Sequence, residues 1–521
     1  MQNKESVRLI LPGEIGPECL GDAWSLVPHH QNSSSLVFWD TFEWCLWFGK
    51  HTLYRAGETY SLCDGDQGWP GSVVCSEKAM GQRRFWEDFQ TEPMRTNLEG
   101  MLGLRALTVV AEGRFSRRCD ELRNGDGKIV CRLDWTVVSA DRQGSAVLKR
   151  YCQVLPLRGY EDETARVVEQ LTRCGAESHG DGPLQVLLSH GQKEPARYTL
   201  RPSFGLDHKT PARGAVGRIL GPILDLAIRN MPGIIDDVDT EFLHDYRICL
   251  RKMRSVLSLV KDVYPREETR RMREILGDLA RHTNRLRDLD VYLLARNEYR
   301  TLLPPLLRPT LDGLFDDFTA ERKRELRRVV STLRGPATRK LLHELSELIS
   351  PTRNHSSSKN AELPVGPLVF QSIFKRYKKI RRLSRGIRSE TPDEAIHQIR
   401  IECKKLRYLL EFFTELIPGE EMAETLKLLR RLQNRLGEFN DASVQQKSLL
   451  EYWQQKKCDG DSGMGLGGLV SILYQRQQLV RCHIVEALEE FCDNSTAGAF
   501  KNTFRLPASA SAADTGQEHI P

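Results

Sequence analysis

An eleven-residue pattern that occurs twice constrains this chain more than any other feature. Residues 244–254 read HDYRICLRKMR and residues 397–407 read HQIRIECKKLR, so both fit the frame His-x-x-Arg-x-x-x-(Arg/Lys)-Lys-x-Arg at a spacing of 153 residues. A second pair of segments, 279–290 and 432–443, keeps the same spacing. Chance does not explain two different pairs of similar segments that keep the same spacing of 153 residues. Residues from about 210 to 500 are therefore predicted to be a tandem repeat of one structural unit.

The repeated pattern predicts a helix with one basic face beside an apolar face. Cations crowded on one stripe repel each other, which costs stability unless an anion lies against them. A solvated charged face is the alternative for any single helix, but two such stripes indicate one shared polyanion. At 100° per residue the stripe is about 80° wide, and its members are His244, Arg247, Arg251 and Arg254 in the first copy and His397, Arg400, Lys404 and Arg407 in the second.

Charge is distributed unevenly along the 521 residues, a length that indicates two or three domains. Residues 1–208 carry a net charge of −4 and the remainder a net charge of +10, so the basic character belongs to the repeated half. No apolar run is long enough to predict a membrane span, and the first residues lack the apolar core of a signal peptide. The 13 cysteines never form Cys-x-x-Cys. This favours free thiols in a reducing cytoplasm over a disulfide scaffold or a zinc finger.

The N-terminal part, residues 1–200, is predicted to be rich in β-structure. Short alternating runs are separated by turn residues, and NGDG at 124–127 predicts a hairpin between two of them. Residues 161–175 predict a helix that ends at Gly175 and has acidic residues in its first turn. The predicted strands are 7–11, 107–111, 128–138 and 146–155.

Three stretches of this part resemble the CYTH family of triphosphate tunnel enzymes, whose fold is a closed antiparallel barrel lined with charge. They are VFWDTFEWCLWFGKHTLYR at 37–55, LRALTVVAEGRFSRR at 104–118 and LPLRGYEDE at 155–163. The resemblance implies a β-barrel with phosphate contacts on its strands. The matching positions are Asp40, Thr41 and Arg55 in the first stretch and Arg105 and Arg114 in the second.

The opening strand departs from the CYTH pattern. The family begins with Glu-x-Glu-x-Lys, whose carboxylates hold a metal, whereas this chain has Glu5, Val7 and Leu9 at those positions. A triphosphatase needs carboxylates to hold Mg²⁺ or Mn²⁺. We therefore expect an inactive domain and no cofactor, with a divalent-metal-dependent triphosphatase as the enzyme alternative.

The remainder of the chain changes to a helical pattern, and its linkers are marked by Pro, Gly and Ser. Within the second unit, residues 375–385 hold seven basic residues and no acid, a run typical of a solvated face or a nucleic-acid patch. The Gly-rich stretch 460–468 is interpreted as a linker. The expected divisions are a linker at 201–215, a first helical unit at 216–349, a linker at 350–367, a second helical unit at 368–500 and a disordered tail at 501–521.

Four motifs of the repeated half resemble the CHAD family, the conserved-histidine α-helical domain. They are HDYRICLRKMR at 244–254, RLRDLDV at 285–291, HQIRIECKKLRY at 397–408 and LQNRLGEFNDA at 432–442. That family consists of two pseudo-symmetric helical bundles that face one another across a basic groove, binds inorganic polyphosphate and often follows a CYTH domain. The predicted fold class is therefore α+β multidomain: an N-terminal antiparallel β-barrel, then an all-α tandem helical bundle with an internal pseudo-twofold repeat.

The CHAD resemblance also implies which residues contact polyphosphate. It implies no catalytic residue and no metal ligand, and Asp288, Asp290 and Asp441 are expected to orient arginines or cap helices. The implied polyphosphate ligands are His244, Arg247, Arg251, Lys252, Arg254 and Arg287 in the first unit, and Lys375, Arg376, Lys379, His397, Arg400, Lys404, Lys405, Arg407 and Tyr408 in the second.

Binding of inorganic polyphosphate without catalysis is therefore the predicted function. Arg offers planar bidentate contacts and Lys offers mobile point charges to a chain of phosphates. Nucleic-acid binding by the same groove is an alternative, but few aromatic residues interleave the basic helices for bases to stack on. The expected location is the cytoplasm, with association to polyphosphate granules. The sequence indicates no membrane partner and leaves the oligomeric state and the protein partners open.

Overall fold

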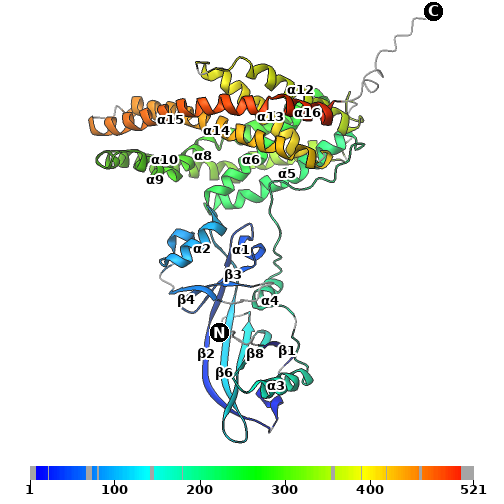
Figure 1. Cartoon of the computed structure of the whole chain (residues 1–521), viewed down its shortest axis with the longest axis vertical. Helices are drawn as coiled ribbons and strands as arrows, with labels where there is room; N and C mark the ends of the chain where they lie inside the picture. Colours follow the sequence, from blue (N-terminus) through cyan, green and yellow to red (C-terminus); the bar gives the residue numbers. More distant parts are fainter. Residues whose placement is uncertain are drawn as a thin grey trace, which may run out of the picture. The chain divides into compact units, whose positions relative to one another are not determined.

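A computed structural model describes residues 7–505 except 14, 22, 66–72, 79, 80, 82, 141–145, 179, 352, 354–357, 389, 418 and 457–459. Glu5 and the tail beyond residue 505 lie outside the described residues. The chain divides between residues 198 and 199 into two compact units (Figure 1). The predicted fold class, an antiparallel β domain followed by a helical domain, is confirmed.

The N-terminal unit is built on one antiparallel sheet with the strand order β1-β8-β7-β6-β2-β3-β4-β5. The expected barrel does not close, because β1 and β5 form the two edges of this sheet and do not pair with each other within the described residues. Most of β5 is exposed, as is usual for a short edge strand. The strands are β1 (Val7–Leu11), β2 (Ser25–Asp40), β3 (His51–Ala56), β4 (Thr59–Asp64), β5 (Val73–Lys78), β6 (Thr108–Arg123), β7 (Ile129–Ser139) and β8 (Val147–Pro156).

The predicted hairpin at 124–127 joins β6 to β7, and Gly127 adopts the left-handed conformation that the turn requires (φ 75°). Sequence patterning did not predict the first half of β2. That half pairs with β6, beginning with Ser25 opposite Arg123. Most of its side chains are exposed, so its sequence lacks the alternation of apolar and polar residues that predicts a strand.

One face of the sheet packs against α3, whose Val167 and Leu171 are fully buried with Leu133 and Val154 of the sheet. The helix ends before Gly175 (φ 97°), as the sequence predicts. The helical segments of this unit are η1 (Pro17–Leu20), α1 (Cys45–Phe48), η2 (Trp86–Asp88), α2 (Glu92–Leu102), α3 (Glu161–Arg173) and α4 (Pro183–His190).

The C-terminal unit is built from helices, and none in the described part of the chain is long and apolar enough to span a membrane. The first copy holds α5 (Ala212–Ile235), α6 (Thr240–Leu259), α7 (Arg266–Arg281), α8 (Asn284–Leu294), α9 (Arg296–Leu302), η3 (Pro305–Leu311), α10 (Asp312–Arg334) and α11 (Pro336–Ile349). The second holds α12 (Val365–Ser384), α13 (Asp393–Phe412), η4 (Thr414–Leu416), α14 (Gly419–Lys456), α15 (Gly460–Phe491) and α16 (Asn494–Phe504).

Helix boundaries reproduce the spacing of the sequence repeat. Helix α13 begins and ends 153 residues after α6 does. The same spacing separates the start of α5 from that of α12 and the start of α7 from that of α14. The two copies also meet directly: the Ala212 N–H donates to the Leu363 carbonyl and the Val365 N–H donates to the Thr210 carbonyl, both at 2.9 Å. The two donors, and likewise the two acceptors, are equivalent positions of the repeat. An approximate twofold axis therefore passes between them.

The Gly-rich stretch 460–468 is helical, so its interpretation as a linker is wrong. Its glycines allow close packing, because a Cβ atom at Gly465 would overlap Thr310 Oγ1 of η3. This approach gives the two copies a common core in which Phe315 and Phe318 of the first copy are buried with Leu449 and Leu469 of the second. The copies are therefore interlocked rather than independent bundles.

Truncation of a buried leucine should measure how strongly the core supports the basic helices. Leu250 is 0% exposed on α6. Leu250→Ala should lower the free energy of unfolding by about 2–5 kcal/mol, through lost transfer energy and a residual cavity. Urea unfolding followed by helical circular dichroism measures this loss. The matched control is Leu306→Ala, because Leu306 is 87% exposed and its truncation should cost less than about 0.5 kcal/mol. Equal losses in the two variants would contradict the assignment of the core.

Candidate functional site

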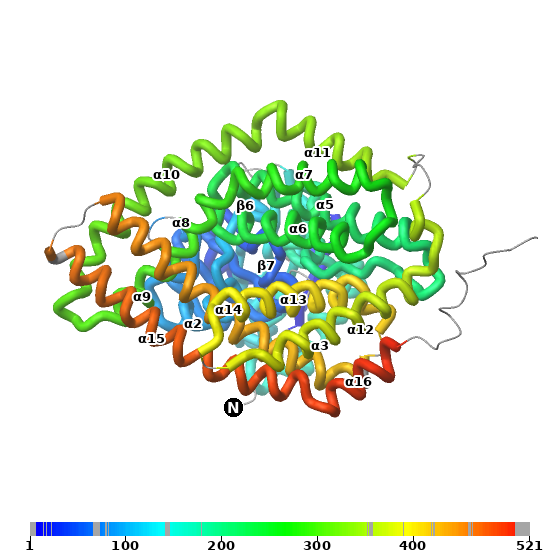
Figure 2. Tube along the Cα trace, turned by 90° about the horizontal axis from the view of Figure 1, so that it is seen from above, coloured from blue at the N-terminus to red at the C-terminus, as the bar shows by residue number. Residues whose placement is uncertain are grey.

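The two copies of the basic pattern lie on α6 and α13, which pack side by side (Figure 2). Asp239 caps α6, since its Oδ1 accepts hydrogen bonds from the N–H groups of Glu241 and Phe242 at 2.9 and 3.3 Å. The apolar faces are anchored in the core, where Leu250 and Leu406 are both 0% exposed. Because the apolar faces are fixed, the rotation of the basic faces is fixed as well.

A groove of about 860 Å³ lies between α6, α8, α13 and α14. All four members of the first basic stripe line it, and Arg400 enters it from the second copy. The tandem pattern therefore brings cations of both copies into one concave surface. The charged and amide residues that line it include His244, Arg247, Arg251, Arg254, Asn284, Arg285, Arg287, Asp288, Arg400, Asn440, Asp441, Lys447 and Glu451.

Three cations at this groove have no carboxylate partner. Arg251 and Arg254 line it, and Lys404 is close enough to Arg251 for their charges to repel. Within the described residues, the side chains of these three make no hydrogen bond or ion pair. Other arginines of the helical unit do pair with acids, as Arg271 does with Glu344 at 2.5 Å. The groove therefore concentrates uncompensated positive charge.

Arg247 and Arg400 occupy equivalent positions and are both half-buried. Burial lowers the pKa of each guanidinium, and the charge of Arg251 lowers it further. Arg400 Nη2 lies 3.8 Å from Asp441 Oδ1, and its buried Nε has no hydrogen-bond partner among the described residues. Arg247 Nη1 donates to the Ala280 carbonyl at 3.1 Å, to Thr283 Oγ1 at 2.9 Å and to Asn284 Oδ1 at 2.7 Å.

The pKa of Lys404 is lowered from its ordinary range near 10.5 to about 8. Burial is the largest cause, and the positive charges of Arg400, Arg251 and Arg407 add to it, while Asp441 opposes the change. The burial and the neighbouring positive charges therefore disfavour the protonated form of Lys404. An anion in the groove would favour the protonated form and raise its pKa.

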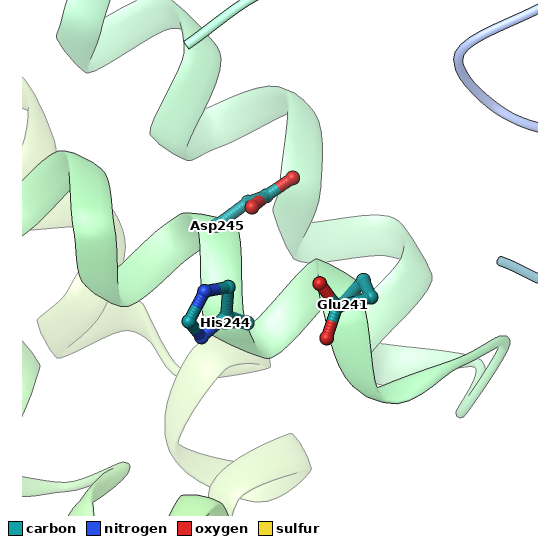
Figure 3. A group of neighbouring side chains, drawn as sticks. All are labelled: Glu241, His244 and Asp245. Atoms are coloured by element: carbon teal, nitrogen blue, oxygen red, sulfur yellow. The ribbon is translucent and has the colours of Figure 1, made fainter. Parts of the chain in front are cut away.

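The two histidines of the repeat have different surroundings. His397 Nδ1 lies 3.1 Å from Asn440 Oδ1, and Asn440 lines the groove. His244 lies on one turn of α6 with Glu241 and Asp245, and their possible ligand atoms are within 4.8 Å of one another (Figure 3). The Arg287 guanidinium is 3.8 Å from Glu241 Oε1 and would repel a divalent cation there. We therefore assign no metal to this group, in which Glu241 pairs with Arg287 of the groove lining.

Several residues that the CHAD resemblance implies as ligands lie away from the lining of this groove. Lys252 is 7% exposed and its Nζ donates to the Leu200 carbonyl at 2.6 Å. Lys375 lines a separate cavity beside α12. The carboxylate of Glu402, which is 2% exposed, is surrounded by three cations. They are Arg376 at 2.6 Å, Lys379 at 3.0 Å and Lys405 at 3.0 Å.

Arg407 and Tyr408 are also engaged with neighbours on α13. The Arg407 guanidinium lies 5.4 Å from the centre of the Tyr408 ring, and its Nε is 3.6 Å from Glu411 Oε1. Tyr408 is 6% exposed and stacks on Phe412. These contacts stabilise the helix and leave Arg407 as a charge that acts on Lys404.

Sequence reasoning missed the amide side chains of the groove. Asn284 is uncharged, and its Oδ1 accepts a hydrogen bond from the Arg247 guanidinium. The Oδ1 of Asn440 lies within hydrogen-bond distance of His397 Nδ1. Both lie within the second pair of repeated segments, 279–290 and 432–443, and this repetition could have indicated that they belong to the site. Of the acids in those segments, Asp290 orients an arginine, because it accepts a hydrogen bond from Arg322 Nε at 2.6 Å.

In the N-terminal unit, the residues matched to the CYTH family have structural contacts. Asp40 is buried, and burial raises the pKa of its carboxyl group to about 6. Its oxygens accept from the backbone N–H groups of Thr41, Leu46 and Trp47 and so fix the start of α1. The other matched side chains also have partners: Arg105 pairs with Glu43 at 2.5 Å, Arg114 Nε donates to Ser33 Oγ at 2.8 Å, and Arg55 lies over the ring of Tyr60.

A cavity of about 190 Å³ on the sheet is lined by Arg8, Arg117 and Asp134, with Arg117 and Asp134 paired to each other. Among the described residues of this unit, no three His, Cys, Asp or Glu side chains bring ligand atoms together. Glu5 lies outside the described residues, and we derive no metal-dependent step here.

The helical part of the chain matches a known protein family. The profile of the CHAD domain family matches residues 218–450. Two curated relatives, both uncharacterized proteins of Mycobacterium tuberculosis, are 26% identical over 245 and 251 residues, or 45% of this chain and 44% of each relative. The match thus spans less than half the length of these relatives.

Two solved structures are also similar. The CHAD domain from the plant Ricinus communis is 22% identical with a TM-score of 0.46, over 56% of this chain and 95% of that one. PptA from Streptomyces chartreusis is 16% identical with a TM-score of 0.41, over 53% of this chain and 99% of that one.

Removing one neighbouring cation should change the titration of Lys404. Arg251→Ala should raise the pKa of Lys404 above about 8, because the protonated amine would lose a repulsive neighbour. Side-chain NMR of the lysine amines across the titration measures this directly. Arg339→Ala, at an exposed arginine of α11, should leave the value unchanged. A pKa near 10.5 in the unaltered protein would refute the electrostatic picture of the groove.

Proposed function

Because residues 218–450 are a CHAD domain, we propose that this chain binds inorganic polyphosphate in the groove between α6 and α13. One observation carries the proposal: the unpaired Arg251 and Arg254 line one concave surface with Arg400 of the second copy, and beside them burial and repulsion lower the pKa of the unpaired Lys404. A protein that holds such charges unpaired loses stability in its free state. A polyanion in the groove would recover that loss.

The chemistry of the groove suits a flexible chain of phosphates. Arg251 and Arg254 offer planar donors that can contact two oxygens at once, and Lys404 offers a point charge. Each phosphate that is neutralised releases condensed counterions, so affinity should fall steeply with salt. The polyanion is a ligand here, and no residue of the groove is assigned a catalytic role.

The groove is less suited to nucleic acid. Among the described residues that line it, Tyr292 is the one Phe, Tyr or Trp side chain, and it is 4% exposed. The described lining therefore offers bases no exposed Phe, Tyr or Trp ring to stack on, and stacking supplies much of the affinity for single strands. Polyphosphate, which lacks bases, makes no such demand.

Two corollaries follow from polyphosphate binding. The protein would associate with polyphosphate granules in the cytoplasm. The N-terminal unit would serve as a scaffold or as a second anion-binding module, since its matched polar residues are engaged in structural contacts.

The double variant Arg251→Ala/Lys404→Ala should separate binding from stability. It alters equivalent positions of the repeat whose side chains have no partner within the described residues. Polyphosphate affinity should fall about a hundredfold, at about 1.4 kcal/mol for each lost cation. The melting temperature of the free protein should stay equal or rise, because mutual repulsion is removed. Calorimetry and thermal unfolding measure the two effects.

The control for this variant is Arg339→Ala/Lys340→Ala, which removes the same charge from the exposed face of α11. Its affinity should stay within about twofold of the original protein, since distant charges are screened. Equal losses in the two double variants would reduce the groove to a general charge effect. Competition by single-stranded DNA of matched charge would identify a nonspecific polyanion surface.

Lys404 predicts how polyphosphate binding depends on pH. Its pKa in the free protein is about 8, and a bound anion should raise that pKa. Affinity should therefore be full below about pH 7 and decrease as the pH rises through about 8, with proton uptake on binding in that window. Calorimetry at about pH 8 in buffers of different ionisation enthalpy measures the uptake. Lys404→Arg should bind without this uptake, since Arg remains charged. The same uptake in both proteins would exclude Lys404 as its source.

A further inference from the structure

A second basic surface lies on α12. Lys375, Lys378 and Arg382 are exposed there, and their side chains make no ion pair within the described part of the chain. They line a cavity of about 560 Å³ together with Lys261, which follows the end of α6. This cavity is distinct from the groove between α6 and α13, with which it shares no lining residue.

The α12 surface is supported from beneath by Glu402. Burial acts to raise the pKa of this carboxyl group, but hydrogen bonds from Lys405, Lys379 and Arg376 outweigh it and lower the pKa to about 2. One buried negative charge thus holds three cations in place. The exposed Lys375, one residue before Arg376, adds charge that no acid balances. The site is therefore built into the packing of α12 on α13.

A third cavity joins the groove to the α12 surface. It has a volume of about 740 Å³ and lies between the second half of α6 and α7. Arg254 lines both this cavity and the groove, and Lys261 lines both this cavity and the α12 cavity. Its lining holds seven cations and three carboxylates. A basic path therefore runs along α6, which rises roughly 22 Å between His244 and Leu259.

The first copy of the repeat keeps only one of the three exposed cations of this surface. The positions of α5 equivalent to Lys375 and Lys378 are Pro222 and Asp225, and only Arg382 has a basic counterpart, Arg229. The position equivalent to Glu402 is Cys249. The helices begin at equivalent residues, so the comparison is between matched places in the fold. The basic extension is therefore an addition to one end of a pseudo-symmetric groove, rather than a consequence of the repeat.

We propose that the exposed face of α12 is a second contact site for the same polyanion, occupied when the bound chain is long enough to leave the groove past Arg254 and Lys261. This inference rests on the proposed function of the groove. It makes the protein selective for long chains, because the second contact is intramolecular once the first is made and so gains effective concentration. A short chain such as tripolyphosphate fills the groove alone.

The test compares two lengths of inorganic polyphosphate on the full chain. Lys375→Ala/Lys378→Ala/Arg382→Ala should lower the affinity for long-chain polyphosphate at least tenfold and leave tripolyphosphate within about twofold. The salt dependence for the long chain should lose about 0.7 of log–log slope for each phosphate contact removed. The matched control is Arg327→Ala/Arg339→Ala/Lys340→Ala, which removes the same charge from exposed positions of α10 and α11.

The outcomes distinguish this inference from the proposed function. Long-chain affinity that stays unchanged, or that falls equally in the α12 triple variant and in the control, overturns the second site. If tripolyphosphate affinity falls as much as long-chain affinity in the α12 variant, chain-length selectivity is overturned. The groove is judged separately by Arg251→Ala/Lys404→Ala, which should weaken both lengths. Failure of the original protein to bind either length overturns the proposed function itself.

Discussion

Repulsion between cations across the contact of α6 and α13 is the constraint on which the helical unit depends. Burial of Leu250 and Leu406 fixes the rotation of the two helices, and their packing side by side places Arg251 where its charge acts on Lys404 and Arg400. The apolar core therefore supplies the free energy that holds like charges close. Other arginines of the unit are neutralised by acids, as Arg271 is by Glu344, whereas Arg251, Arg254 and Lys404 are not.

The duplicated architecture explains why such a site can be built at all. Equivalent helices related by an approximate twofold axis place equivalent cations on opposite sides of one surface, so a single basic helix sequence provides both walls. The common core formed by Phe315, Phe318 and Leu469 prevents the copies from moving apart under their own charge. Duplication alone would produce a symmetric groove, and the substitutions that created the α12 surface break that symmetry.

The sequence predicted the repeat, its register and the basic stripes because these depend on local periodicity, which directly determines the faces of a helix. It did not predict which of the neighbouring cations would face the groove. Lys252 is adjacent to Arg251, yet it points to the Leu200 carbonyl, a contact that depends on a distant loop. The helical conformation of residues 460–468 was missed for a similar reason, since close packing on Thr310 rather than local propensity favours glycine there. The open sheet and the exposed half of β2 likewise depend on long-range pairing.

The residue at the centre of the contact shows how charge and stability are balanced. The first copy has Arg251 at this position of the repeat, and the second copy has Lys404. Two arginines would remain charged at every physiological pH and would repel each other permanently. A lysine whose pKa is lowered to about 8 can release its proton when the groove is empty and recover it beside an anion. The departure from repeat symmetry at this position therefore lowers the cost of the unliganded state while keeping the full charge for the bound state.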